Sequence, residues 1–248
     1  MNTKIIKILE VPISNVTMKE AVDIVDGFVK SDKMHKVYTP NPEIVMLARN
    51  NPKFMEVIKK ADLVVPDGIG VVIGSRLQKG DKLPERVPGY DLVQNTMKQA
   101  VKEGYKYYFF GSKPGVAEQA AEKMRETYPG IQIVGTRDGY FKLEDEPAII
   151  KDINESGANI LLVALGAPKQ ETWIEEHQHL LPNVRVAIGV GGSLDGMAGI
   201  VKRAPLIYQK LGLEWFYRLM KQPSRFVRML VLPQFLIEVL LYKGDRKK

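Results

Sequence analysis

The sequence predicts an α/β fold, with a mainly parallel sheet covered by helices on both faces, followed by a helical segment at the C-terminus. Up to about residue 190, short β-branched runs alternate with amphipathic stretches, a pattern that favours such a sheet. The 248 residues are enough to bury a large core, and 45% apolar with 26% charged residues is typical of a folded chain. The last fifty residues differ from the rest in charge, which indicates an appendage.

The expected elements follow one another along the chain with recognisable boundaries. A helix over 18–30 opens with a capping box from Thr17 to Glu20, and a helix over 115–128 begins after Pro114. We expect residues 1–198 to form the α/β core and residues 199–248 to form a basic amphipathic appendage. The strands are expected at 4–9, 36–39, 62–65, 106–110, 131–134, 159–165 and 185–190.

Glycine- or proline-containing turns follow five of these strands. In open parallel sheets ligands bind at the carboxyl ends of strands, where glycines let the backbone approach a ligand and helix N-termini favour anions. The pattern predicts one composite site for a phosphorylated ligand, although ordinary turn chemistry also explains each turn taken alone. The turns lie at 40–42, 66–68, 111–112, 166–170 and 191–193.

Several common chemistries find no support in the sequence. The chain has no cysteine, which excludes disulfides, cysteine-ligated zinc and thiol nucleophiles. It has no P-loop motif, and "GVGGS" at 189–193 lacks the last glycine of a dinucleotide-binding fingerprint. No Asp-x-Asp occurs, so we expect neither a bound metal nor a cofactor. The N-terminal stretch lacks the apolar core of a signal peptide, and none is expected.

Two ionisable residues in the loops are candidates for chemistry. Asp67 stands between a buried strand and a helix start, where a partly desolvated carboxylate could act as a general base. The alternative for Asp67 is an N-cap of a helix that begins near Ile69, and the two roles are compatible. Arg86 lies in a Pro- and Gly-rich loop, where a guanidinium suits a diphosphate; the commoner alternative is a surface arginine with no task.

The basic charge of the chain belongs to its C-terminal segment. Residues 199–248 hold eleven Lys or Arg and three acids, whereas the first 198 residues sum to −1. The apolar run over 229–237 is nine residues long, and a bilayer span needs about 20. Four cations recur at spacings of three, four and three, and Pro223 indicates two short helices that meet near Gln222. These cations are Arg218, Lys221, Arg225 and Arg228.

Three interpretations of this segment compete. A pair of helices packed on the core is the plain one, but eleven cations are many for a structural face. A nucleic-acid surface would explain the charge and not the exposed leucines, so we expect no nucleic-acid partner. A peripheral membrane element explains both features, because basic residues meet anionic lipid headgroups while leucines dip below them.

Six stretches, in order along the chain, resemble the WecG/TagA/CpsF glycosyltransferases, and most closely the TagA branch. The stretch "VALGAPKQETWI" followed by "KRAPLIYQKLGLEWFYRL" is especially specific, and "TPNPEIV", "VPDGIGVV", "LPERVPGYDL" and "GVGGSLDGMAG" complete the set. The resemblance implies a Rossmann-like core. It implies transfer of an N-acetylmannosamine-type sugar from a UDP donor to the 4-hydroxyl of N-acetylglucosamine on undecaprenyl diphosphate, with inversion and without metal.

The resemblance also implies residue roles, on the positions that match the family's motifs. Asp67 corresponds to the proposed base, and Arg86 to the arginine that stabilises the departing UDP diphosphate. Three polar residues would line the same pocket and position sugar hydroxyls: Thr39, Asn41 and Gln170. The turn glycines complete the expected substrate-binding set: Gly111, Gly166, Gly191 and Gly192.

In the family the C-terminal appendage completes the active site at the membrane. By resemblance, Arg218, Arg225 and Arg228 would hold the diphosphate of the lipid acceptor, with Lys221 beside them. The expected partners are therefore a UDP-sugar, a polyprenyl-diphosphate-linked N-acetylglucosamine and an anionic membrane surface. The expected location is the cytoplasm, peripherally attached to the inner face of the cell membrane. A homo-oligomer in the absence of membrane is left open.

Other functions remain as alternatives. Related branches use N-acetylmannosaminuronic acid or build capsular polysaccharide with other sugars, and the sequence does not identify the donor. More distant alternatives are a nicotinamide or flavin oxidoreductase and a non-catalytic membrane or nucleic-acid adaptor.

Overall fold

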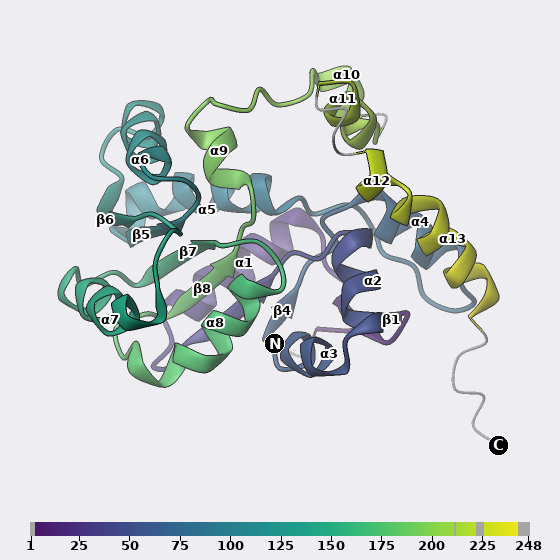
Figure 1. Cartoon of the computed structure of the whole chain (residues 1–248), viewed down its shortest axis with the longest axis horizontal. Coiled ribbons are helices and arrows are strands. Elements are labelled where there is room, and N and C mark those ends of the chain that lie inside the picture. Colours follow the sequence, from purple (N-terminus) through teal and green to yellow (C-terminus); the bar gives the residue numbers. More distant parts are fainter. Residues whose placement is uncertain (1–2, 211, 222–225, 243–248) are drawn as a thin grey trace.

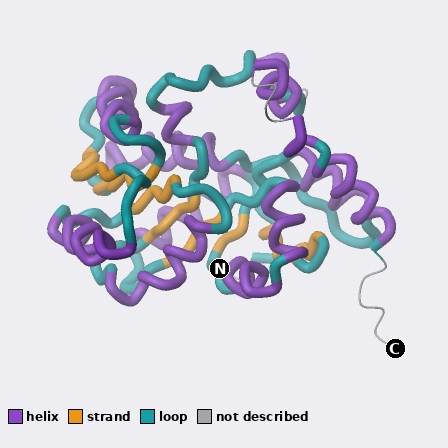
Figure 2. Tube along the Cα trace, viewed as in Figure 1, coloured by secondary structure: helices purple, strands orange, loops and turns teal. Residues whose placement is uncertain are grey.

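The computed structural model describes residues 3–210, 212–221 and 226–242. Its centre is a six-stranded sheet in the order β4-β3-β8-β7-β5-β6, in which every neighbouring pair is parallel (Figures 1 and 2). The predicted α/β architecture is confirmed. The strands are β3 (His35–Tyr38), β4 (Leu63–Val64), β5 (Lys106–Gly111), β6 (Gln132–Arg137), β7 (Ile160–Ala164) and β8 (Val186–Gly189).

The strand expected at 4–9 does not join this sheet. It forms β1 (Ile5–Ile8), which pairs antiparallel with β2 (Val11–Ser14) in a separate two-stranded sheet. The turn between the two strands places Leu9 at φ 49° and Glu10 at φ 71°. Neither residue type favours positive φ, so the sequence carried no turn signal and β2 was missed.

Helices cover both faces of the sheet (Figure 1). One face carries α1 (Met18–Val29), α5 (Gly89–Glu103), α6 (Val116–Thr127) and α9 (Ser193–Met197). The other carries α2 (Pro42–Asn50), α3 (Pro52–Lys59), α4 (Ile69–Leu77), α7 (Glu146–Glu155) and α8 (Lys169–His177). Short 3-10 turns lie at Leu143–Asp145 and Gln178–Leu180. The capping box predicted for α1 is present, with Glu20 N–H donating to Thr17 Oγ1 at 3.3 Å and Thr17 N–H to Glu20 Oε2 at 2.7 Å.

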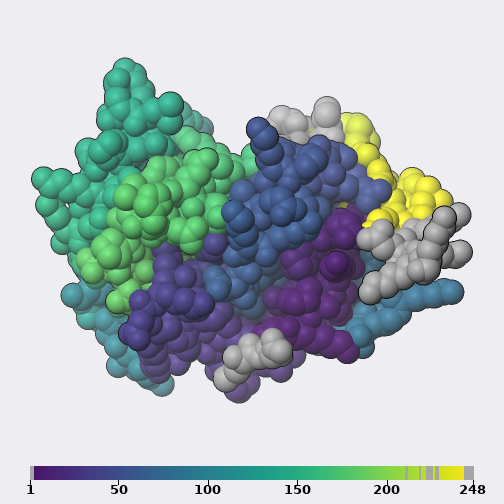
Figure 3. All heavy atoms as spheres, turned by 90° about the horizontal axis from the view of Figure 1, so that it is seen from below, coloured from purple at the N-terminus to yellow at the C-terminus, as the bar shows by residue number. Residues whose placement is uncertain are grey.

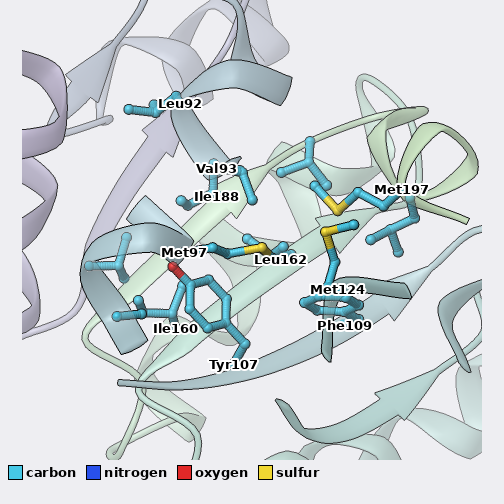
Figure 4. Close-up of a cluster of buried hydrophobic side chains, with 14 of the residues drawn as sticks. Leu92, Val93, Met97, Tyr107, Phe109, Met124, Ile160, Leu162, Ile188 and Met197 are labelled. Carbon is cyan, nitrogen blue, oxygen red and sulfur yellow. The ribbon is translucent and has the colours of Figure 1, made fainter. Parts of the chain in front are cut away.

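The two faces hold separate apolar clusters because side chains alternate along each strand. Figure 4 shows part of the first cluster, where Met97 of α5 and Met124 of α6 lie over Phe109 and Leu162. Tyr107 is fully buried in the same cluster, and its hydroxyl forms a hydrogen bond of 3.1 Å with Thr96 Oγ1. Its polar end is therefore satisfied inside the core.

The C-terminal segment returns to the second face of the sheet. It contains α10 (Leu206–Lys210), α11 (Glu214–Lys221), α12 (Phe226–Met229) and α13 (Val231–Leu241). Figure 3 shows the last of these helices, in yellow, at one end of the molecule. Phe235 and Val239 of α13 are buried in the second cluster, against α2 and α4. The break expected near Gln222 falls on residues 222–225, which lie outside the described residues. The domain boundary near residue 198 stays a prediction.

Among the glycines of the five turns, Gly111 at the end of β5 lies closest to the backbone of a neighbouring strand. Its φ is +125°, and an added Cβ would lie 2.4 Å from the carbonyl oxygen of Ala164. We expect Gly111→Ala to lower the free energy of unfolding by roughly 3 kcal/mol or more, because backbone strain and overlap with a neighbouring strand add together. Urea unfolding followed by circular dichroism measures the loss.

Gly115 offers a matched control for this substitution. Its φ is +81°, but an added Cβ would meet nothing within 4 Å. Gly115→Ala should therefore lose only the left-handed backbone cost of about 1–2 kcal/mol. Equal losses for the two variants would contradict a steric contact between Gly111 and Ala164.

Candidate active site

The carboxyl ends of β3, β4 and β8 lie next to one another and bring three turns together. Tyr38 pairs with Val64 across β3 and β4, and β3 runs parallel to β8 on its other side. Thr39, directly after β3, is 6% exposed, and its Oγ1 donates to the Gly189 carbonyl at 3.0 Å. This hydrogen bond joins the turn after β3 to the end of β8.

Asp67 follows β4 at the same edge and contacts the start of α5. Its Oδ1 accepts a hydrogen bond of 3.2 Å from the N–H of Gly89, the first residue of that helix. The alternative that Asp67 is the N-cap of α4 is wrong, since Gly68 occupies that position. The half-buried carboxylate is instead oriented by the start of α5, which begins 22 residues later in the chain.

Close backbone contacts keep this edge compact. An added Cβ on Gly89 would lie 2.9 Å from Thr39 Cγ2, and one on Gly68 would lie 2.7 Å from Pro42 Cδ. Asn41, expected to position a sugar, uses its Oδ1 to accept a 3.0 Å hydrogen bond from Ile44 N–H and so caps α2. Glycine is required at both positions because two helix starts, α4 and α5, press against the turn after β3.

Gln170 links α8 to the turn after β8. Its Oε1 accepts from Gly191 N–H at 3.0 Å, and its Nε2 donates to Glu171 Oε1 at 2.8 Å. The side chain is only 2% exposed, and an added Cβ on Gly189 would lie 2.9 Å from its Nε2. Gln170 therefore packs against Gly189 and supports the backbone of Gly191 through a hydrogen bond.

Glu171 was not singled out from the sequence, although it belongs to the "GAPKQE" stretch. It is 1% exposed, and its Oε2 has no hydrogen-bond partner among the described residues. Burial raises the pKa of Glu171 to about 6, against the opposing effect of the hydrogen bonds from Gln170 and from its own backbone. A carboxyl group that resists ionisation therefore lies directly behind Gln170.

The remaining predicted glycines also lie at this edge of the sheet. Gly166 precedes α8, with its carbonyl accepting from Gln170 N–H at 2.9 Å, and Gly192 is the N-cap of α9. After Gly111, Ser112 donates its N–H to Ala164 at 2.9 Å and its Oγ to Asp195 Oδ2 at 3.0 Å. All five turns expected to build the composite site thus follow the carboxyl ends of neighbouring parallel strands.

Arg86 lies in the loop between α4 and α5, as expected, and it is not an unpaired surface residue. It forms an ion pair with Glu214 at the start of α11, and the two side chains are 17% and 14% exposed. Glu214 Oε1 also lies 3.5 Å from Arg203 Nε, and Arg203 binds Asp91 of α5 through two contacts of 2.5 and 2.6 Å. The sequence did not predict which of these charged residues form ion pairs, because the partners come from segments far apart in the chain.

The cations predicted to hold a lipid diphosphate are described only in part. Lys221 is exposed at the end of α11, with its Nζ 5.9 Å from the centre of the Tyr217 ring. Arg225 lies outside the described residues, and so do the side chains of Arg218 and Arg228. Within residues 3–210, 212–221 and 226–242, no group of three His, Asp or Glu side chains is placed to hold a metal ion.

The buried carboxyl of Glu171 generates a pH prediction. Its pKa rises from an ordinary 4.5 to about 6 on folding, so the folded state binds the extra proton between these values. The stabilisation is complete below pH 4.5 and is lost as the pH rises through 6, a change of about 2 kcal/mol. Relative to Glu171→Gln, the wild-type chain should lose this amount between pH 4.5 and 7.5 in urea unfolding.

Glu175 provides a control of opposite sign on the same helix. Burial opposes its charge, but hydrogen bonds from Lys36 and Lys60 outweigh burial and lower its pKa. The stability that Glu175 contributes is present above its ordinary pKa and is lost on acidification. The free energy of unfolding of the wild type should therefore increase relative to that of Glu175→Gln as the pH rises. Parallel pH curves for the wild type and Glu171→Gln would contradict the raised pKa.

The sequence of this chain is similar to those of known glycosyltransferases. The model of the glycosyl transferase WecG/TagA/CpsF family matches residues 6–248. A relative from Bacillus spizizenii (strain ATCC 23059 / NRRL B-14472 / W23) is 38% identical over 221 residues, which cover 89% of this chain and 84% of the relative. One from Bacillus subtilis (strain 168) is 36% identical over 238 residues, 96% of this chain and 91% of the relative. Both relatives are named N-acetylglucosaminyldiphosphoundecaprenol N-acetyl-beta-D-mannosaminyltransferase. Since the family model matches nearly its whole length, this chain belongs to the WecG/TagA/CpsF glycosyltransferases.

Proposed function

We propose that this chain transfers N-acetylmannosamine from UDP-N-acetylmannosamine to the 4-hydroxyl of N-acetylglucosamine on undecaprenyl diphosphate, as in synthesis of a teichoic acid linkage unit. Both Bacillus relatives are named for transfer of N-acetylmannosamine to such a lipid-linked acceptor. The observation that carries the proposal is the position of Asp67. It lies at the edge where Thr39, Gln170 and the turn after β8 meet, in a chain that those relatives match along most of its length.

In the proposed reaction Asp67 is the general base. Its carboxylate takes the proton of the acceptor's 4-hydroxyl while the hydroxyl oxygen attacks the anomeric carbon of the donor. The bond from that carbon to the diphosphate breaks on the opposite face, so UDP leaves and the configuration inverts. The hydrogen bond from Gly89 N–H to Oδ1 supports this role because it orients the carboxylate before the substrate arrives.

The departing UDP carries negative charge that the protein must stabilise. We assign this task to Arg86 and to the N-terminus of α5, which begins three residues after it. Fixed positive groups of this kind can replace a metal ion, because they are oriented before charge develops on the leaving group. We therefore propose a metal-independent mechanism.

We also propose that the chain acts at the cytoplasmic face of the membrane, attached by its C-terminal helices. Among the described residues, no helix is long and apolar enough to span a bilayer. Large apolar side chains are nevertheless exposed on α11 to α13, in a segment whose sequence is rich in Lys and Arg. They are Trp215, Phe216, Met220, Phe226, Leu230, Ile237, Leu240 and Leu241. This combination suits the headgroup region of an anionic membrane.

Replacing Asp67 with Asn should remove the base while keeping its shape. We expect turnover to fall by roughly 100- to 10,000-fold, since the amide cannot accept the proton. Transfer from UDP-N-acetylmannosamine to a short-chain lipid-diphosphate acceptor is followed by mass spectrometry in excess EDTA. A panel of other UDP-sugars in the same assay identifies the donor.

Asp62→Asn is the matched control, because Asp62 lies at the opposite end of β4 and accepts a hydrogen bond from Lys36 N–H at 3.0 Å. We expect its turnover to stay within about twofold of the wild type. Near-normal transfer by Asp67→Asn would remove Asp67 as the base, and loss of wild-type activity in EDTA would contradict the metal-independent mechanism.

If α13 attaches the chain to the membrane, replacing two of its exposed leucines should weaken membrane binding. Leu240 and Leu241 are 61% and 72% exposed, and each leucine that enters an apolar phase contributes roughly 1.5–3 kcal/mol. The double change Leu240→Gln and Leu241→Gln should weaken sedimentation with anionic liposomes at least about tenfold. Leu143→Gln is the control, since Leu143 is 82% exposed but lies before α7, away from α13 (Figure 1). Equal binding by both variants would contradict attachment through α13.

A further inference from the structure

We propose that Glu214 is a positioning residue that orients Arg86, so that Arg86 can act on the leaving diphosphate only when the C-terminal helices are docked on the core. The inference rests on the proposed function of Arg86. It adds to the site an acidic residue of the appendage, which acts through Arg86.

The first observation is the contact between the two side chains. Glu214 is the first residue of α11, and its Oε2 accepts from Nη1 of Arg86, 128 residues earlier in the chain. The two side chains are 17% and 14% exposed, so water screens the ion pair less than it screens a surface pair. A long side chain with several rotatable bonds is thereby held in one place.

The second observation is that the pair belongs to a network of alternating charge. Glu214 lies between Arg86 and Arg203, with Oε1 3.5 Å from Arg203 Nε, and Arg203 in turn binds Asp91. Burial opposes the charge of Arg203, but its hydrogen bonds to Asp91 and the charges of Asp91 and Glu214 raise its pKa. Removing the Glu214 charge would leave two neighbouring guanidinium groups with no carboxylate between them.

The third observation is where the network ends. Asp91 is in the first turn of α5, two residues after Gly89, whose N–H donates to Asp67 Oδ1. Arg86 is three residues before the same helix. Glu214 therefore contacts the segment that orients the proposed base on both sides of Gly89: directly through Arg86, and through Arg203 to Asp91.

A close contact beside Glu214 places the start of α11 over the Asp67 turn. Gly212 has φ +71°, and an added Cβ would lie 2.8 Å from Cγ1 of Ile69. Ile69 is the first residue of α4, two residues after Asp67. The appendage thus reaches the site through backbone packing as well as through charge.

These contacts imply that Arg86 is less well oriented when the appendage is not docked on the core. An arginine that must stabilise a leaving group contributes most when it is held in place before the reaction, because no ordering is then needed in the transition state. When α11 leaves the core, Arg86 loses Glu214 and with it this restraint. Docking of the appendage and orientation of Arg86 are consequently one event.

A double-mutant cycle on turnover tests the inference. Glu214→Gln keeps the shape of the side chain and removes its charge, and Arg86→Gln removes the residue through which Glu214 acts. We expect Glu214→Gln to lower kcat about tenfold or more in the wild-type background, with a smaller change in KM. In the Arg86→Gln background the same change should alter kcat less than about twofold.

Glu238→Gln is the matched control. Glu238 of α13 also joins the appendage to the core, through an ion pair of 2.7 Å with Arg49 Nε, and its side chain is 29% exposed. It takes no part in the Arg86 network, so its kcat should stay within about twofold of the wild type. Glu214→Asp, which keeps the charge on a shorter side chain, should fall between the wild type and Glu214→Gln and guards against misfolding of the amide variant.

Each outcome decides the question. Equal losses from Glu214→Gln in both backgrounds would show that Glu214 only anchors the appendage and would overturn the inference. A faster or more tightly UDP-binding Glu214→Gln variant would show that the carboxylate competes with the diphosphate, which also overturns it. A wild-type chain that neither transfers sugar nor binds UDP would instead overturn the proposed function itself.

Discussion

The parallel pairing of β3 with both β4 and β8 is the constraint on which the site depends. Because the three strands run in one direction, the residues that follow them must emerge at one edge, and there Thr39 bonds to the carbonyl of Gly189. Asp67 reaches that edge from the shortest of the strands, β4, and is oriented by the start of α5. The burial of the sheet on both faces and the chemistry at its edge are thus two results of one arrangement.

Rigidity at this edge comes from groups packed behind it. Gln170 and Glu171 are almost fully buried, and they support the turn after β8 by a chain of hydrogen bonds from Gly191 to Glu171. Burying a carboxyl group costs free energy that its hydrogen bonds offset only in part, and burial raises the pKa of Glu171 accordingly. The hydrogen bonds of Gln170 to Gly191 and Glu171 hold the turn after β8 in place, and its role in binding a sugar stays a prediction.

The sequence predicted what depends on local patterns and missed what depends on pairing over long distances. Alternating strands and helices, the capping box at Thr17 and the turns after five strands all follow from neighbours a few residues apart, and the structure contains them. The hairpin of β1 and β2 was missed because Leu9 and Glu10 adopt positive φ, a conformation that neither residue type favours. Asp67 and Arg86 were found as candidates, but the partners Gly89 and Glu214 come from segments that only the folded chain brings close.

The appendage shows most clearly why composition alone misleads. Its eleven cations suggested a surface that attracts anions, yet its most consequential charge in the described structure is an acid, Glu214, which pairs with the core's Arg86. A segment that only needed to reach a membrane could carry its cations and leucines without contacting the sheet. This one also buries Phe235 and Val239 in the second apolar cluster. It joins a charge network whose Asp91 lies two residues after Gly89, the hydrogen-bond donor to Asp67. If the proposed roles are correct, the C-terminal helices join the exposed apolar surface proposed to meet the membrane to Arg86, the arginine proposed to stabilise the leaving group, because α11 carries both exposed aromatic side chains and Glu214.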